Sequence, residues 1–200
     1  MATHLRPRAR KQPGFFNDEL DAAADDNDLF IVERLVARRK KKARAEYLVL
    51  WQGYSKEECS WLVEDAMTFD ADQCYTHPEP PLRALLDNVS TFLAYISASL
   101  KCGVNSSFKF IVPFRTDVYM FLFGRKGKEP SHGLGRWYEN EDFNTEDFPS
   151  NWSKCHDKLG DGCTIDFPIR LHSKLKWSPR TFIKQDDGTV MPKARSFEEV

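Results

Sequence analysis

One stretch, Glu46 to Tyr54, most limits what this chain can fold into. Its bulky residues Tyr47, Val49 and Trp51 alternate with the others in the period of a strand, and Gly53 then breaks the strand. Upstream, residues 30–36 predict a second strand, because they are rich in β-branched and aromatic side chains. A short third strand is expected at residues 60–63. The sequence therefore predicts an α+β chain with a small, curled antiparallel sheet near its start.

The same region carries residues at fixed spacing that form a specific signature. They are Phe30, Val32-Glu33, Glu46-Tyr47, Val49, Trp51, Gly53-Tyr54, Ser60-Trp61 and Glu64. In these residues, the segment 29–76 resembles a chromodomain of the heterochromatin-protein or Polycomb type. The resemblance implies a curled three-stranded antiparallel barrel with a C-terminal helix. Asp70 could cap that helix, which would end near Tyr75.

The resemblance also implies a binding site for methylated lysine. Phe30, Trp51 and Tyr54 take the positions of an aromatic cage, whose ring faces attract a methylated ammonium. The histone tail would add as a strand between the segment before Phe30 and the segment after Trp61. The cage rim and peptide groove would be formed by Val32, Glu58, Ser60, Leu62 and Glu64. The alternative, that the three aromatic residues are simply core, stays open.

Two features of this region leave further interpretations open. The basic run Arg38, Arg39, Lys40, Lys41, Lys42 and Arg44 is a solvated hairpin loop or a patch that contacts DNA or RNA phosphates. Leu62-Val63 replaces the Glu-Pro that is usual after the tryptophan of the family, which changes the strand expected to pair with the peptide. Besides a methyl-lysine reader and a nucleic-acid-binding module, the sequence is compatible with a chromo-type domain derived from a mobile element, with a structural or interaction role.

The rest of the chain has no recognised pattern. Residues 1–28 predict a disordered charged tail, and residues 82–101 an amphipathic helix with apolar residues at helical spacing. Residues 104–184 predict an unassigned α+β region. Its aromatic hairpin would pair residues 108–114 with residues 118–123, and a further strand is expected at residues 165–171. Residues 185–200 again have the character of a tail.

Several function classes are disfavoured. Net charge is −1, the five cysteines are scattered, and no apolar run approaches the ~20 residues of a membrane span. The chain lacks a phosphate-binding loop, a nucleophile elbow and a zinc-protease motif, so no enzyme and no cofactor are expected. Cys155, His156, Cys163 and His172 lack a Cys-x-x-Cys pair, so no metal is expected either. We predict a nuclear, chromatin-associated reader of methylated histone tails. Binding of DNA or RNA by the basic run stays open, as does a protein partner or self-association through the second half.

Overall fold

The computed structural model describes residues 4–5, 30–102, 111–124 and 126–200. The chain forms two compact units. Unit 1 comprises Met1–Tyr75 and Trp177–Glu198, and unit 2 comprises Thr76–Lys176 and Glu199–Val200. Each unit mixes helices with antiparallel strands.

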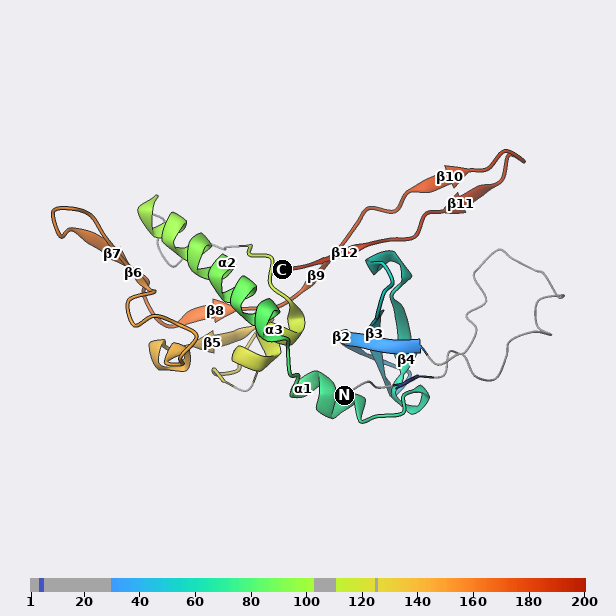
Figure 1. Cartoon of the computed structure of the whole chain (residues 1–200), viewed down its shortest axis with the longest axis horizontal. Helices are drawn as coiled ribbons and strands as arrows, with labels where there is room; N and C mark the ends of the chain where they lie inside the picture. The colour runs from blue at the N-terminus through green and yellow to red at the C-terminus, as the bar shows by residue number, and fades with distance from the viewer. Residues whose placement is uncertain (1–3, 6–29, 103–110, 125) are drawn as a thin grey trace. The chain divides into compact units, whose positions relative to one another are not determined.

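Unit 1 is built on one antiparallel sheet. Its strands are β1 (His4–Leu5), β2 (Phe30–Lys41), β3 (Arg44–Trp51) and β4 (Ser60–Val63), and they pair in the order β1-β2-β3-β4. Figure 1 labels β2, β3 and β4. Register shifts between Val32 and Arg34, and between Leu35 and Ala37, interrupt the pairing of β2 with β3. Such irregularities bend a strand. The predicted three-stranded sheet, β2–β4, is confirmed, whereas its closure into a barrel stays a prediction.

The core of unit 1 lies between this sheet and a short helix, α1 (Ala71–Thr76). The side chain of Asp70 accepts a hydrogen bond from the backbone N–H of Gln73 at 2.8 Å, which is the predicted helix cap. Tyr47 is fully buried and donates its hydroxyl to Asp72 of α1 at 3.1 Å. Burial raises the pKa of Tyr47 to about 12, so the phenol stays protonated and holds α1 against the sheet.

Unit 1 also contains most of the C-terminal segment. The strands β10 (Phe182–Lys184) and β11 (Val190–Pro192) pair as a hairpin, and β12 (Phe197–Glu199) pairs with β9 (Leu175–Trp177). The segment 185–200, for which the sequence predicts a tail, therefore contains two paired strands. The sequence offers only a short apolar run at each of these strands. β11 pairs with β10 and buries little, whereas β12 buries Phe197 and Glu199.

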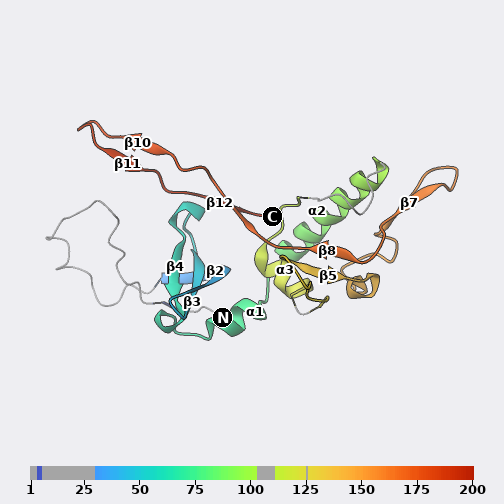
Figure 2. The same ribbon diagram turned by 180° about the vertical axis from the view of Figure 1, so that it is seen from behind.

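Unit 2 is organised around α2 (Leu82–Lys101), which has the predicted bounds. Its apolar face packs with a cluster of aromatic rings into one core. The paired strands β5 (Arg136–Tyr138) and β8 (Ile169–Leu171), labelled with α2 in Figure 2, also contribute to this core. The remaining elements are α3 (Thr116–Leu122), the 3₁₀ helix η3 (Asn140–Phe143) and the hairpin of β6 (Lys154–His156) and β7 (Gly162–Thr164). The rings of the core belong to Phe92, Phe114, Tyr119, Phe123, Tyr138, Phe143, Phe148, Trp152 and Phe167.

The aromatic hairpin predicted at residues 108–123 is wrong in its second half. Residues 118–123 lie mostly in a helix, α3, instead of a strand. The buried carboxylate of Glu199 accepts a hydrogen bond from the N–H of Thr116 at 2.8 Å, and the amide oxygen of Asn88 accepts one from Arg115 at 2.7 Å. These groups satisfy the start of α3 from distant parts of the chain, which local periodicity does not reveal. In the first half, residues 111–114 belong to no strand, and residues 108–110 lie outside the described residues.

The strand predicted at residues 165–171 is shorter in the structure, where β8 contains only Ile169–Leu171. Pro168 has no N–H to donate to a neighbouring strand, so regular pairing begins after it. Ile165 and Phe167 nevertheless pack against the core of unit 2, which explains their apolar character.

Candidate functional site

Three aromatic rings predicted as a cage lie together at one end of the sheet. The centroid of the Phe30 ring is 6.0 Å from that of Trp51 and 5.8 Å from that of Tyr54. The planes are inclined by 65° and 59°, so the rings do not stack face to face. Phe30 begins β2 and Trp51 ends β3, so the antiparallel pairing of these strands brings the two together.

Local contacts fix two of these rings. The indole N–H of Trp51 donates to the Ser60 hydroxyl at 3.0 Å, and its ring is 9% exposed. Gly53, with φ +81°, allows the chain to turn directly after β3. The turn is closed by a hydrogen bond from the N–H of Tyr54 to the carbonyl of Trp51 at 3.2 Å. Tyr54 is 44% exposed, so one ring of the group is open to solvent and one belongs to the core.

The predicted rim residues fall into different environments. Val32 lies opposite Trp51 in the β2–β3 register and packs against the core, as does Leu62 of β4. Glu58 ends the 3₁₀ helix η1 (Lys56–Glu58), where its Oε2 accepts hydrogen bonds from the backbone N–H and the hydroxyl of Ser55, both at 2.9 Å. Glu64 starts a second 3₁₀ helix, η2 (Glu64–Ala66). Ser60 therefore orients Trp51, and Glu58 stabilises the turn that follows Tyr54.

The edge of the sheet beside Phe30 pairs with another strand of the same chain. β1 lies antiparallel to β2, with His4 opposite Ile31 and Leu5 opposite Phe30. Sequence reasoning missed this pairing, because residues 1–28 are polar and predict a tail. Residues 6–29 lie outside the described residues. The start of β2 therefore accepts an added strand at the position where the aromatic rings gather.

Comparison with known families agrees with this geometry. Residues 30–74 match the family model of the Chromo (CHRromatin Organisation MOdifier) domain. This segment is a chromo domain. No curated protein and no solved structure matches the chain. The chain thus carries a chromatin-associated binding module, of a family whose domains are not enzymes, while unit 2 has no assigned family.

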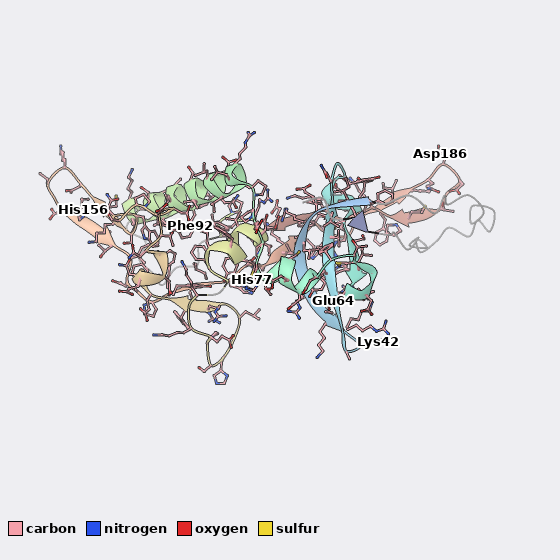
Figure 3. The ribbon with its side chains drawn as sticks, turned by 60° about the horizontal axis from the view of Figure 1, so that its bottom comes forward. Lys42, Glu64, His77, Phe92, His156 and Asp186 are labelled. Carbon is pink, nitrogen blue, oxygen red and sulfur yellow. The ribbon has the colours of Figure 1, made fainter. Side chains whose placement is uncertain are left out.

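The basic run of the chromo domain lies on strands and not in a loop. β2 continues to Lys41 and β3 starts at Arg44, which leaves only Lys42 and Ala43 as the turn at the tip of the hairpin (Figure 3). We call residues 38–44 the basic hairpin.

Part of the charge of the basic hairpin is neutralised within the chromo domain. Arg39 forms a 2.6 Å ion pair with Glu46 and lies 3.9 Å over the ring of Trp61. Arg38 forms a 2.7 Å ion pair with Asp72, and Lys41 lies 3.7 Å from Glu46. Within the described part of the chain, no carboxylate forms an ion pair with the side chains of Lys40, Lys42 and Arg44. These three are the cations of the hairpin that could contact an external anion.

Outside the chromo domain, the described residues contain no group of three or more His, Cys, Asp or Glu side chains that could hold a metal ion. Cys155 and Cys163 lie opposite each other in the β6–β7 hairpin and are free thiols. Among the helices that the structure describes, none combines the length and the apolar character that a membrane span requires.

Proposed function

We propose that the chromo domain binds methylated lysine of a histone tail between Phe30, Trp51 and Tyr54. The observation that carries this proposal is the grouping of the three rings beside a strand edge that accepts a partner. A methylated ammonium keeps its charge but loses hydrogen-bond donors, so aromatic faces suit it better than a carboxylate pair does. Each such contact contributes roughly 0.5 to 2 kcal/mol.

The strand edge supports the other half of the proposal. A histone tail adds to a sheet edge through backbone hydrogen bonds, which do not depend on lysine methylation. Selectivity for the methylated form should therefore depend on the rings. Chromo domains are typically chromatin-associated and nuclear, and we place this protein's activity in the nucleus on that basis.

Tyr54→Ala provides the sharpest test, because Tyr54 is exposed and does not belong to the core of unit 1. We expect the variant to lose about 2- to 30-fold of the preference for trimethylated over unmodified peptide, the equivalent of one aromatic contact. Phe30→Tyr keeps the ring face and should retain the preference. The measurement is calorimetric titration of the full chain with matched histone-tail peptides. Equal affinity of the wild type for both peptides would contradict the proposal.

Nucleic-acid binding through the basic hairpin is the second candidate function. It is supported by Lys40, Lys42 and Arg44, which have no ion-pair partner in the described part of the chain. Chromo domains generally bind methylated histone tails or nucleic acids, so both candidates agree with the family.

A further inference from the structure

The hairpin of β10 and β11 is held at both of its ends. We call residues 178–196 the arm. At its base, the Nε of Arg195 donates to the carbonyl of Ser178 at 2.8 Å, and the guanidinium lies 5.6 Å from the centre of the Trp177 ring. At its tip, Asp187 accepts hydrogen bonds from the N–H and the hydroxyl of Thr189, at 2.8 and 2.6 Å. An isolated two-stranded hairpin is only marginally stable in water, so these contacts help to hold the strands in register.

The strands of the arm expose apolar side chains to solvent. Phe182 is 64% exposed and Val190 is 61% exposed. In the β10–β11 register Phe182 lies opposite Pro192, and Lys184 lies opposite Val190. Because side chains alternate between the two faces of a strand, these four residues share one face. An exposed aromatic ring and a lysine therefore lie side by side on the same surface.

The charge of the arm is separated along its length. Its basic residues Arg180, Lys184, Lys193 and Arg195 lie on the paired strands or nearer the base, and its acidic residues Asp186 and Asp187 lie in the turn, where Figure 3 labels Asp186. Within the described part of the chain, no carboxylate forms an ion pair with the side chains of Arg180 and Lys184. Lys193 is opposite Thr181 and so lies on the other face of the ribbon. The stem is thus a cationic ribbon with exposed apolar groups.

We propose that the arm binds single-stranded nucleic acid, with a base stacked on Phe182 and phosphates held by Arg180 and Lys184. Nonspecific single-strand binding combines an aromatic platform with a basic track along the backbone. An acidic peptide would use the cations and leave the exposed ring unexplained, whereas a duplex keeps its bases stacked inside. This inference concerns residues outside the chromo domain and does not depend on methyl-lysine binding.

The test is fluorescence anisotropy of the full chain with a labelled single-stranded oligonucleotide, as DNA and as RNA, and with the matching duplex. We expect binding to the single strands and weaker binding to the duplex. Phe182→Ala should weaken single-strand binding about 5- to 150-fold, the cost of losing one stacked base. Phe182→Trp should retain it. Ile183→Ala, an equally simple truncation on the opposite face, should have little effect.

The salt dependence separates the arm from the basic hairpin. Combined Arg180→Gln and Lys184→Gln should reduce the slope of log affinity against log salt by about 1.4, because each single-strand phosphate contact contributes roughly 0.7. Combined Lys40→Gln and Lys42→Gln removes the same charge from the basic hairpin and should leave the slope unchanged.

Three results would overturn the assignment. The first is that the wild-type protein binds no single strand. The second is that the arm variants bind single strands as tightly as the wild type does. The third is that only the basic-hairpin variant loses binding. Self-association that Phe182→Ala abolishes, without nucleic-acid binding, would also overturn it and assign the face to a second copy of the chain. The methylated-peptide titration has a separate readout, so failure of one proposal leaves the other standing.

Discussion

Two residues in left-handed conformations close the basic hairpin. Lys42 has φ 47° and Ala43 has φ 65°, although neither is glycine. A two-residue hairpin loop with positive φ at both positions matches the right-handed twist of its strands, and glycine or asparagine usually fills it. A side chain in this conformation costs roughly 1–2 kcal/mol per residue. The β2–β3 pairing therefore imposes a local strain at the tip.

We predict that Ala43→Gly stabilises unit 1 by about 0.5–1 kcal/mol, since relief of the strain exceeds the added entropy of the unfolded chain. Hydrogen exchange of the β2–β3 amides reports this change separately from unit 2. Ala45→Gly, two positions later and inside β3, is the matched control and should destabilise the strand. Slower exchange in both variants, or in neither, would contradict this account of the turn.

The sequence predicts which side chains gather at the candidate site, but not what holds them. Spacing and family pattern identify Phe30, Trp51 and Tyr54, because strand pairing fixes where they meet. The hydrogen bond from Trp51 to Ser60 and the one that Glu58 accepts from Ser55 depend on side-chain rotamers, which the spacing of residues does not reveal. Leu62, predicted for the groove, packs against the core because it lies opposite Tyr47 in the β3–β4 register.

At the level of strands and helices, β1 has the most direct functional consequence. It pairs with the start of β2, which is the edge that the proposed peptide would use. A chain segment that occupies this edge competes with an added peptide, and the apparent affinity falls by the fraction of molecules in which the edge is free. The two pairings cannot use the same backbone groups of β2 at once.

We predict that His4→Pro with Leu5→Pro raises the affinity for histone-tail peptide at least about twofold, if β1 occupies the edge half of the time or more. Proline removes the N–H that strand pairing needs. His4→Ala with Leu5→Ala keeps the backbone donors and should leave the affinity unchanged. The same calorimetric titration measures all three proteins. Weaker binding by the proline variant would mean that β1 builds the site instead of competing for it.

Elements that depend on local pattern could be predicted, and those that depend on distant partners could not. α2 has a complete apolar face at helical spacing, so its bounds agree with the prediction. α3 and β12 are short, and distant backbone and side-chain partners fix them. β1 is shorter still, and the sequence that separates it from β2 shows no strand period, so nothing local indicates the pairing.

Across the full chain, the two units are interleaved along the sequence. Unit 2 takes its last two residues, Glu199 and Val200, from beyond the C-terminal segment of unit 1. Val200 exchanges backbone hydrogen bonds with Lys174 at 2.8 and 3.0 Å, and the carbonyl of Glu199 accepts one from Phe114 at 3.1 Å. These contacts make the end of the chain part of the fold of unit 2.

We predict that Glu199→Ala destabilises unit 2 by about 1–3 kcal/mol, because the N–H of Thr116 loses its acceptor in a buried site. Glu199→Gln keeps an acceptor oxygen and should cost much less. Hydrogen exchange of the α3 amides measures both variants, and the β2–β3 amides of unit 1 serve as the internal reference. Equal protection of α3 in the alanine variant and the wild type would show that the carboxylate does not stabilise the helix.

The contact between Thr116 and Glu199 also sets an order of events on the ribosome. The two residues are separated by 83 positions, so at about 5–20 residues per second the acceptor is made roughly 4–17 s after its donor. The paired strands β2, β3 and β4 and the helix α1 lie between Phe30 and Thr76, and they leave the exit tunnel long before that. The strands and the helix of the chromo domain can thus form on a nascent chain in which Glu199, the acceptor at the start of α3, has not yet been synthesised.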